Sequence, residues 1–275
     1  MLNEAQSFEK KAVKIMAIVT ITSDLGVNNH IISLIKGALL HTEPIPVIVD
    51  ISHEINSFDI IQAAFVVAQS WRSFPVGTIH IIAVNDLPEA HLDWLIMERE
   101  GHFFVMQNNG LCSLIFTDEH GIIYTLPVVG EPFFILPTLL RNIMYQLSMK
   151  KLLSEINDLT LTDEVVKRYK FQPISVGNII RGSVLYIDSF DNVITNISKD
   201  LFETFSHSRP FKIKMRSHLP LTEIQNNYSD APLGEILCLF NSANLLEIAI
   251  NMGKASTLFG LNPGEIIQIE FEEKN

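Results

Sequence analysis

The sequence predicts an α/β N-terminal domain, with a parallel-type sheet flanked by helices, followed by an all-β barrel-like C-terminal domain. In the first half, β-branched apolar runs alternate with stretches of helical spacing, an order typical of parallel sheets covered by helices. From Arg181 onward, turn residues separate short apolar strands, as in sandwiches and barrels. Residues 153–180 are mixed and polar, and we interpret them as a helix end and a linker.

The predicted α/β domain begins with the order β-α-β-α-β. Continuous apolar runs indicate buried strands, and apolar residues three or four apart indicate helices. These patterns predict strands at 15–22, 46–51 and 77–85, and helices at 28–40 and 59–70. Further short strands are predicted at 103–107, 113–116 and 122–126, and a helix at 137–152 closes the domain.

The second half shows shorter apolar segments. They predict strands at 183–188, 193–197, 211–215, 236–241, 246–251 and 266–271. The resulting domain boundaries are an N-terminal extension at 1–14, the α/β domain at 15–165, a linker at 166–180 and the barrel-like domain at 181–275.

Composition excludes several classes of partner. The net charge of -11 argues against nucleic acid and against anionic membranes, because both bind basic surfaces. Apolar residues make up 47% of the chain but never form a run long enough to span a bilayer. The lysines before the apolar run at 15–21 are not followed by a small-residue cleavage site, so we expect a cytoplasmic protein. The two cysteines are expected to be buried thiols, and no residue spacing predicts a metal site.

Asp24 is the first candidate binding residue. It follows the first predicted strand and precedes Gly26, at the kind of strand end where α/β sheets bind ligands. A carboxylate there accepts two hydrogen bonds from a ribose diol, although an Asp in a loop or helix cap gives the same pattern. His53 and Glu54 follow the second strand, and we interpret them as structural residues that hold a loop.

Two segments of the second half also carry polar residues between strands. Asp188 ends one strand and Asn192 begins the next. An Asn amide offers the donor and acceptor that match an adenine edge, and an ionised Asp matches an ammonium. The other segment is 239–255. Hairpin turns rich in Asn and Asp explain both segments equally well when each is taken alone.

Taken together, these segments resemble the SAM hydroxide adenosyltransferase family, whose relatives include the SAM-dependent fluorinase and chlorinase. The stretches ITSDLG and IVDISHEINSFDIIQAAFVVAQSWRSFPVGTIHIIAV follow the family order T-D-x-G, D-I-x-H-x-I and F-P-x-G-T. The stretches YIDSFDNVITNI and FNSANLLEIAINMGKA follow D-x-F-x-N-x-x-T-N and N-S-x-x-x-L-E-I-A-x-N-x-G. The likeness covers residues 15–271, nearly the whole chain.

The resemblance implies a homotrimer that binds S-adenosyl-L-methionine (SAM) or adenosine between the N-terminal domain of one subunit and the C-terminal domain of the next. By position, Asp24 resembles the residue that holds the ribose hydroxyls, and Asp188 the residue that faces the methionine ammonium. Asn192 resembles the adenine-edge residue, and Ser242 the one that receives the methionine carboxylate. Asn251 belongs to the same pocket motif. SAM is the substrate or ligand, and no cofactor is implied.

The family reaction is the attack of water on the ribose C5′, which yields adenosine and L-methionine. An Asp-Arg-His set orients that water in the hydrolases, and here the sequence departs from the family. Where the family reads V-D-P-G-V-G, residues 84–94 read VNDLPEAHLDW. Asn85 or Asp86 replaces the Asp by position, and His91 is the nearby base, so Asp86 and His91 are the candidate catalytic substitutes. Where the family reads F-H-G-R-D, residues 129–133 read VGEPF.

Three hypotheses follow from this mixture. The chain is a SAM hydrolase in which Asp86 and His91 replace the usual set, or a catalytically inactive SAM or adenosine binder that acts as a sensor or structural trimer. The third hypothesis is another nucleophilic substitution at C5′. The orientation of Asp86 and His91 relative to the ribose C5′ distinguishes the first two.

Overall fold

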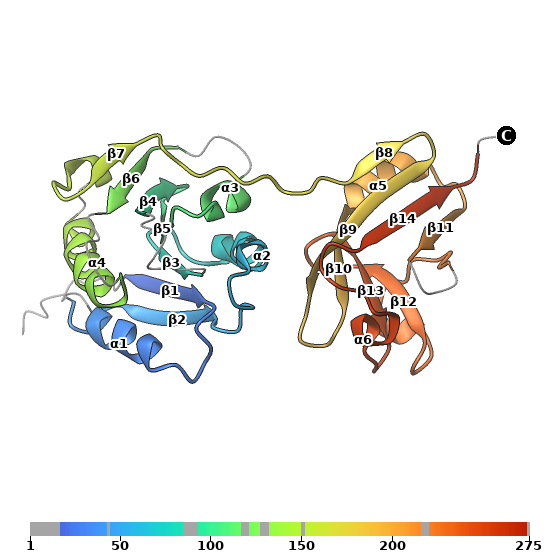
Figure 1. The fold of residues 1–275 in the computed structure, drawn as a ribbon, viewed down its shortest axis with the longest axis horizontal. Coiled ribbons are helices and arrows are strands. Elements are labelled where there is room, and N and C mark those ends of the chain that lie inside the picture. Colours follow the sequence, from blue (N-terminus) through green and yellow to red (C-terminus); the bar gives the residue numbers. More distant parts are fainter. Residues whose placement is uncertain are drawn as a thin grey trace, which may run out of the picture. The chain divides into compact units, whose positions relative to one another are not determined.

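The computed structural model describes residues 17–42, 45–84, 93–116, 121–126, 132–149, 152–215 and 220–273. The chain divides into two compact units, Met1–Arg168 and Tyr169–Asn275 (Figure 1). None of the helices within the described residues is both long and apolar enough to cross a membrane.

The N-terminal unit is built on a seven-stranded sheet with the order β2-β1-β3-β5-β4-β6-β7. Its strands are β1 (Ile18–Ser23), β2 (Val47–Ser52), β3 (Ile79–Ala83), β4 (Trp94–Arg99), β5 (His102–Gln107), β6 (Ile123–Leu126) and β7 (Thr160–Thr162). β2, β1, β3 and β5 are parallel, as predicted, whereas β4, β6 and β7 pair antiparallel. The sheet is therefore mixed. The tight turn at Glu100 and Gly101, both with positive φ, reverses the chain between β4 and β5.

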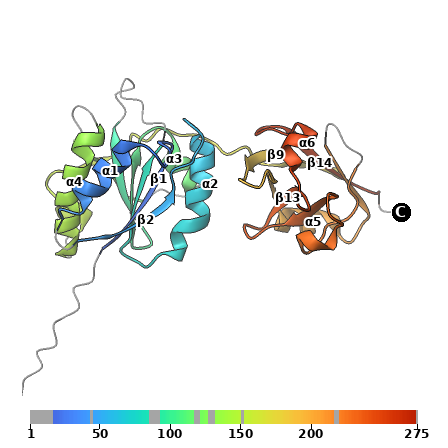
Figure 2. The ribbon, with the colours of Figure 1, turned by 90° about the horizontal axis from the view of Figure 1, so that it is seen from below.

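Helices cover both faces of this sheet, as Figure 2 shows. One face carries α1 (His30–Leu39) and α4 (Pro132–Ser148), and the other carries α2 (Ile60–Ser70) and α3 (Leu111–Ile115). Short 3-10 turns occur at η1 (Trp71–Ser73) and η3 (Leu153–Glu155). The side chains of Asn29 and Asp59 accept backbone N–H groups at the starts of α1 and α2, which explains where both helices begin.

The structure differs from the local predictions for this unit at three places. Residues 113–116, predicted as a strand, belong mostly to α3, because Asn109 Oδ1 accepts the Leu111 N–H and starts a helical turn after β5. Such a short apolar run has no periodicity that separates strand from helix. β4 was not predicted at all. α4 begins at Pro132, five residues before the predicted 137–152, and proline is favoured in the first helical turn.

The C-terminal unit is a second seven-stranded sheet, antiparallel throughout, with the order β11-β14-β9-β10-β13-β12 and β8 paired to β9. Its strands are β8 (Ile174–Val176), β9 (Ile179–Ile187), β10 (Val193–Ser198), β11 (Phe211–Lys214), β12 (Ile236–Phe240), β13 (Leu245–Ile250) and β14 (Ile266–Phe271). Its helical elements are α5 (Lys199–Ser206), η4 (Tyr228–Asp230) and α6 (Ala255–Phe259). The strand runs predicted for this half all fall on these strands, and β14 has the predicted bounds.

The predicted barrel is not closed. Within the described residues, β11 and β12 lie at the two edges of the sheet order, and no ladder joins them. The sheet is curved, as Figure 1 shows. Its main apolar core includes the fully buried Val193, Ile248 and Ile269, and a smaller buried cluster consists of Ala231, Leu237, Leu239 and Ala249. β8 and the first residues of β9 fall inside the segment 166–180, so part of the predicted linker is a strand of this sheet.

Candidate functional site

The carboxyl ends of the four parallel strands meet at one edge of the first sheet. The register pairs Ser23 of β1 with Ala83 of β3, and Thr22 of β1 with Ser52 of β2. Asp24 therefore begins a turn at the edge where α/β sheets bind ligands. Asp24 is half-buried, and its Oδ2 accepts the backbone N–H of Phe58 over 2.8 Å.

The loop that follows β2 holds this turn in place. The carbonyl of His53 accepts the backbone N–H of Gly26 over 2.8 Å, and Gly26 has the positive φ of 79° that glycine adopts readily. His53 thus ties two loops together, which confirms its interpretation as a structural residue. Glu54 N–H donates to Ser52 Oγ over 3.1 Å within the same loop.

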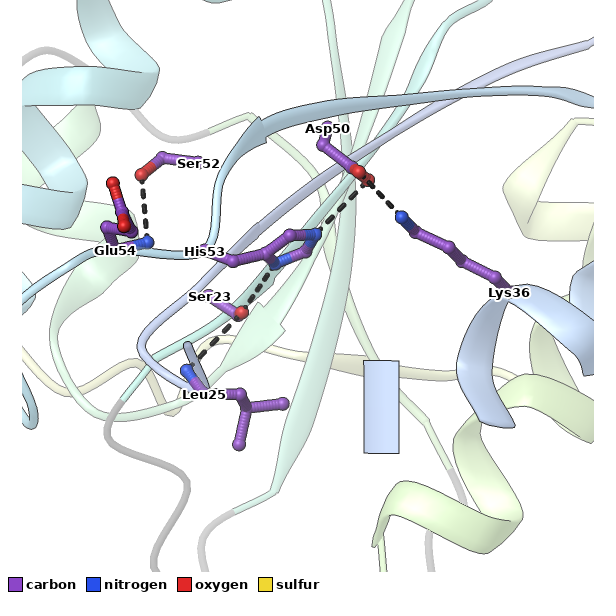
Figure 3. Close-up of polar contacts among 7 residues, drawn as sticks. All are labelled: Ser23, Leu25, Lys36, Asp50, Ser52, His53 and Glu54. Atoms are coloured by element: carbon purple, nitrogen blue, oxygen red, sulfur yellow. Dashed lines mark hydrogen bonds and ion pairs between the residues drawn. The ribbon is translucent and has the colours of Figure 1, made fainter. Parts of the chain in front are cut away.

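A chain of four side chains runs beneath the turn, as Figure 3 shows. Ser23 Oγ lies 2.8 Å from His53 Nδ1, and His53 Nε2 lies 3.2 Å from Asp50 Oδ1. Lys36 of α1 completes the chain with a 2.6 Å ion pair to Asp50 Oδ2. Burial acts to raise the pKa of Asp50, but hydrogen bonds from Lys36 and His53 and their charges outweigh it and lower the pKa. Asp50 therefore stays ionised.

Phe58 is a residue of this edge that the sequence analysis missed. Its φ of 69° is unusual for a bulky side chain, and the side chain remains 61% exposed. Backbone strain of this kind costs about 1–3 kcal/mol and is most common where a loop serves a site. The sequence carries one weak signal, an aromatic residue directly before the helix cap Asp59.

Asn108 and Asn109 lie at the same edge, directly after β5, and both are buried. Asn109 Nδ2 donates to the carbonyl of Val84 over 2.9 Å, and Asn108 Nδ2 donates to the carbonyl of Glu164 over 2.8 Å. These amides tie neighbouring loops to the sheet. Asp86 and His91, the candidate catalytic substitutes, lie outside the described residues.

In the C-terminal unit, Asp188 and Asn192 contact each other directly. They occupy the hairpin turn between β9 and β10, where Asp188 Oδ2 accepts Asn192 Nδ2–H over 3.0 Å. Asp188 Oδ1 also accepts the backbone N–H groups of Phe190 and Asn192, over 2.9 and 2.8 Å. Asn192 is buried, whereas Phe190 is 75% exposed. The turn therefore holds the Asp188 carboxylate through its own donors.

Asn251 and Ser242 lie at opposite ends of β13. Asn251 follows the strand, at the end where β10 begins, and its Nδ2 donates to the carbonyl of Ala231 over 2.8 Å. Ser242 is exposed in the turn between β12 and β13. Asn241 shapes that turn, because its Oδ1 accepts the N–H groups of Ala243 and Leu245 over 2.9 and 3.2 Å.

Glu247 is a further buried polar residue of this unit, and the sequence analysis did not single it out. It lies in the middle of β13 with 3% of its surface exposed, where it accepts Tyr228 O–H over 2.6 Å and Asn241 Nδ2–H over 3.1 Å. Burial, the hydrogen bond to Glu247, and the charges of Glu247 and Asp188 raise the pKa of Tyr228. The available signal was a charged residue within the otherwise apolar run at 245–250.

The candidate residues thus form two groups. Asp24 belongs to the edge of the first sheet, and Asp188, Asn192, Ser242 and Asn251 belong to the second unit. The described residues contain no group of three His, Cys, Asp or Glu side chains that could hold a metal ion.

Comparison with known protein families gives a match for each unit. Residues 19–129 match the SAM hydroxide adenosyltransferase N-terminal domain, and residues 182–268 match the corresponding C-terminal domain. The two matches together span most of the chain, in the order that the motifs predict.

Individual relatives match over almost their full length. An (R)-S-adenosyl-L-methionine hydrolase of Methanocaldococcus jannaschii is 26% identical over 272 residues, which cover 93% of this chain and 96% of the relative. A fluorinase of Actinoplanes sp. is 24% identical over 92% of this chain and 97% of its own length. An uncharacterised conserved protein from Thermotoga maritima has the same fold, with a TM-score of 0.78 over 92% of this chain and 99% of the relative, at 24% identity.

Proposed function

Because this chain belongs to the SAM hydroxide adenosyltransferase family, we propose that it binds SAM and hydrolyses it to adenosine and L-methionine. The observation that carries this proposal is the match of both units to the family. The half-buried Asp24 at the ligand-binding edge of the first sheet supports it.

The proposed reaction forms one bond and breaks one. A water oxygen attacks the ribose C5′, and the electron pair of the C5′–S bond leaves with the sulfur of methionine. The water loses one proton to a base. Because a sulfonium is already a good leaving group, the protein mainly has to position and desolvate the water, and no cofactor is needed.

We propose that the Asp24 carboxylate accepts hydrogen bonds from the ribose hydroxyls of SAM. A carboxylate offers two acceptor oxygens, which is the chemistry that the two hydroxyls of a ribose diol require. Phe58, whose backbone N–H donates to Asp24, is itself 61% exposed, so the same loop carries an apolar surface. This combination suits a nucleoside, which presents hydroxyls next to a flat base.

We assign the remainder of SAM to the C-terminal unit of a neighbouring copy in a homotrimer. Asp188 would accept the ammonium, Asn192 the adenine edge, and Ser242 the methionine carboxylate, with Asn251 in the same pocket. The direct contact between Asp188 and Asn192 supports their action as one unit. The buried, unpaired Cys112 and Cys238 support a cytoplasmic location.

We assign the activation of water to Asp86 and His91, which follow β3 in the sequence. The test is incubation of the purified protein with SAM, followed by chromatography for adenosine, methionine and other 5′-substituted adenosines. The proposal expects adenosine and methionine above a no-enzyme control, and a loss of that activity in Asp86→Ala or His91→Ala.

One observation favours a second candidate, a SAM or adenosine binder without turnover. The V-D-P-G-V-G and F-H-G-R-D motifs are replaced at 84–94 and 129–133, while the segments assigned to binding are retained. Calorimetry on the same samples separates the two. Tight binding of SAM without products would support the binder and contradict the hydrolase. Formation of another 5′-substituted adenosine would identify a different nucleophile.

A further inference from the structure

We propose that His53 is a positioning residue for Asp24, acting through the chain Lys36–Asp50–His53–Ser23 that Figure 3 shows. The functional part of this inference rests on the proposed role of Asp24 in binding the ribose. The positioning itself is a property of the fold and is tested separately below.

Three contacts link the loop after β2 to the turn after β1. The His53 ring contacts Ser23 Oγ, the His53 carbonyl accepts Gly26 N–H, and Phe58 N–H donates to Asp24. Two of these contacts come from His53 itself, on either side of Asp24 in the sequence. The orientation of the Asp24 carboxylate therefore depends on where His53 lies.

A Ser-His-Asp arrangement also occurs in nucleophilic enzymes, but here the three residues hold a turn in place and do not present a reactive hydroxyl. Ser23 is fully buried, so its hydroxyl is not open to a substrate. Its Oγ also lies 3.4 Å from the backbone N–H of Leu25, inside the turn itself. A nucleophile must reach the reacting carbon, whereas this hydroxyl points into the protein.

The charges of Lys36 and Asp50 favour one assignment of donor and acceptor to the two ring nitrogens of His53. The Asp50 carboxylate, paired with Lys36, favours a proton on His53 Nε2, which leaves Nδ1 to accept the Ser23 hydroxyl. Ser23 Oγ then accepts from Leu25 N–H. Lys36 of α1 is thus connected to the turn through Asp50, His53 and Ser23.

The same sheet offers a matched control. His80 of β3 is also buried, and its Nδ1 lies 2.8 Å from the hydroxyl of Thr20 on β1. Its other ring nitrogen contacts His102 at 3.2 Å, inside an aromatic core and away from the contacts that link the two loops. His53→Gln and His80→Gln therefore each remove a histidine bound to a β1 hydroxyl, but only the first touches the turn.

The experiment combines hydrogen exchange with calorimetry on the full chain. His53→Gln is expected to speed exchange at the amides of Gly26 and Phe58, and His80→Gln to leave both near wild type. With adenosine as the probe, His53→Gln should weaken binding about tenfold, the cost of misplacing one charged acceptor, and His80→Gln less than about twofold. Asp24→Ala removes the acceptor itself and is expected to show the largest loss of adenosine affinity.

Unchanged exchange at Gly26 and Phe58 in His53→Gln would overturn the positioning role. Equal losses of affinity in both histidine variants would also overturn it, because they would reflect general destabilisation. If the wild-type protein bound neither adenosine nor SAM, the proposed function would fail, and the exchange result would still decide whether His53 positions the turn.

Discussion

The two carboxylates assigned to the ligand are held in different ways. Asp188 accepts three hydrogen bonds, all from Phe190 and Asn192 within its own hairpin turn. Asp24 accepts a hydrogen bond from Phe58, 34 positions away, and its turn is braced by the ring and carbonyl of His53. One carboxylate is positioned locally, and the other by tertiary contacts.

This difference has a consequence for function. A turn that supplies its own donors keeps its geometry as long as the hairpin forms. A turn that is held by contacts from α1, β2 and the loop after β2, as Figure 3 shows, changes when those elements change, and the proposed ligand contact of Asp24 changes with it. Substitutions that touch no ligand are therefore expected to alter binding at Asp24 more than at Asp188.

The largest effect is expected from the two carboxylates themselves. Asp24→Ala should weaken SAM binding about 100-fold, because the ribose loses a charged acceptor, and should cost less than about 1 kcal/mol of stability. Asp188→Ala should also destabilise the second unit by about 1–3 kcal/mol, since three donors, one of them on the buried Asn192 side chain, lose their acceptor. Calorimetry and urea unfolding measure both quantities. Equal free energies of unfolding for Asp24→Ala and Asp188→Ala would contradict the claim that only Asp188 is held by the donors of its own hairpin turn.

The next effect concerns Glu247, the buried carboxylate in the middle of β13. Glu247→Leu should cost about 2–4 kcal/mol of unfolding free energy, because Tyr228 O–H and Asn241 Nδ2–H lose their acceptor. Tyr228→Phe is the control and should cost about 1 kcal/mol. Urea unfolding gives both values. A smaller loss in Glu247→Leu than in the control would mean that the buried carboxylate does not hold the turn that carries Ser242.

The smallest effect is an acid sensitivity of the N-terminal unit. Burial, and then the charge of His102, lower the pKa of His80 from 6.5 to about 4. Between these values the unfolded chain binds more protons, so stability is fully present above pH 6.5 and is lost as the pH falls towards 4. The loss from His80 should be about 2 kcal/mol between about pH 7 and about pH 5.

Hydrogen exchange at the two pH values locates this loss. After correction for the intrinsic slowing of amide exchange at lower pH, the protection factors of β1, β3 and β5 peptides should be smaller at the lower pH, and those of the second sheet should change less. His80→Gln should remove most of the difference between the units. An acid sensitivity that was equal in both sheets would show that His80 is not its source.

The sequence predicted the parts of the fold that local patterns determine. An apolar segment predicted β14 with its observed bounds, and helical spacing predicted α1 and α2 to begin within two residues of their observed starts. β4 and α3 were missed or misassigned, because short apolar runs depend on their neighbours. The mixed order of the first sheet depends on the turn at Glu100 and Gly101, where a non-glycine residue adopts a positive φ.

The candidate site likewise contains residues that the sequence motifs predict and residues whose roles depend on the three-dimensional structure. Family motifs predict Asp24, Asp188 and Asn192 as binding residues, and these roles stay predictions. The motifs did not reveal that Ser242 and Asn251 lie at opposite ends of β13. The roles of Phe58 and Glu247 depend on a backbone angle and on burial, neither of which is visible in composition or spacing.

The central claim is that water attacks the ribose C5′ of SAM. The most direct test is incubation of the full-length protein with SAM in heavy-oxygen water, followed by mass spectrometry of the nucleoside product. The proposed reaction predicts adenosine that carries one heavy oxygen on its 5′ carbon, together with unlabelled L-methionine. Adenosine without the label, or no adenosine above the no-enzyme control, would contradict it.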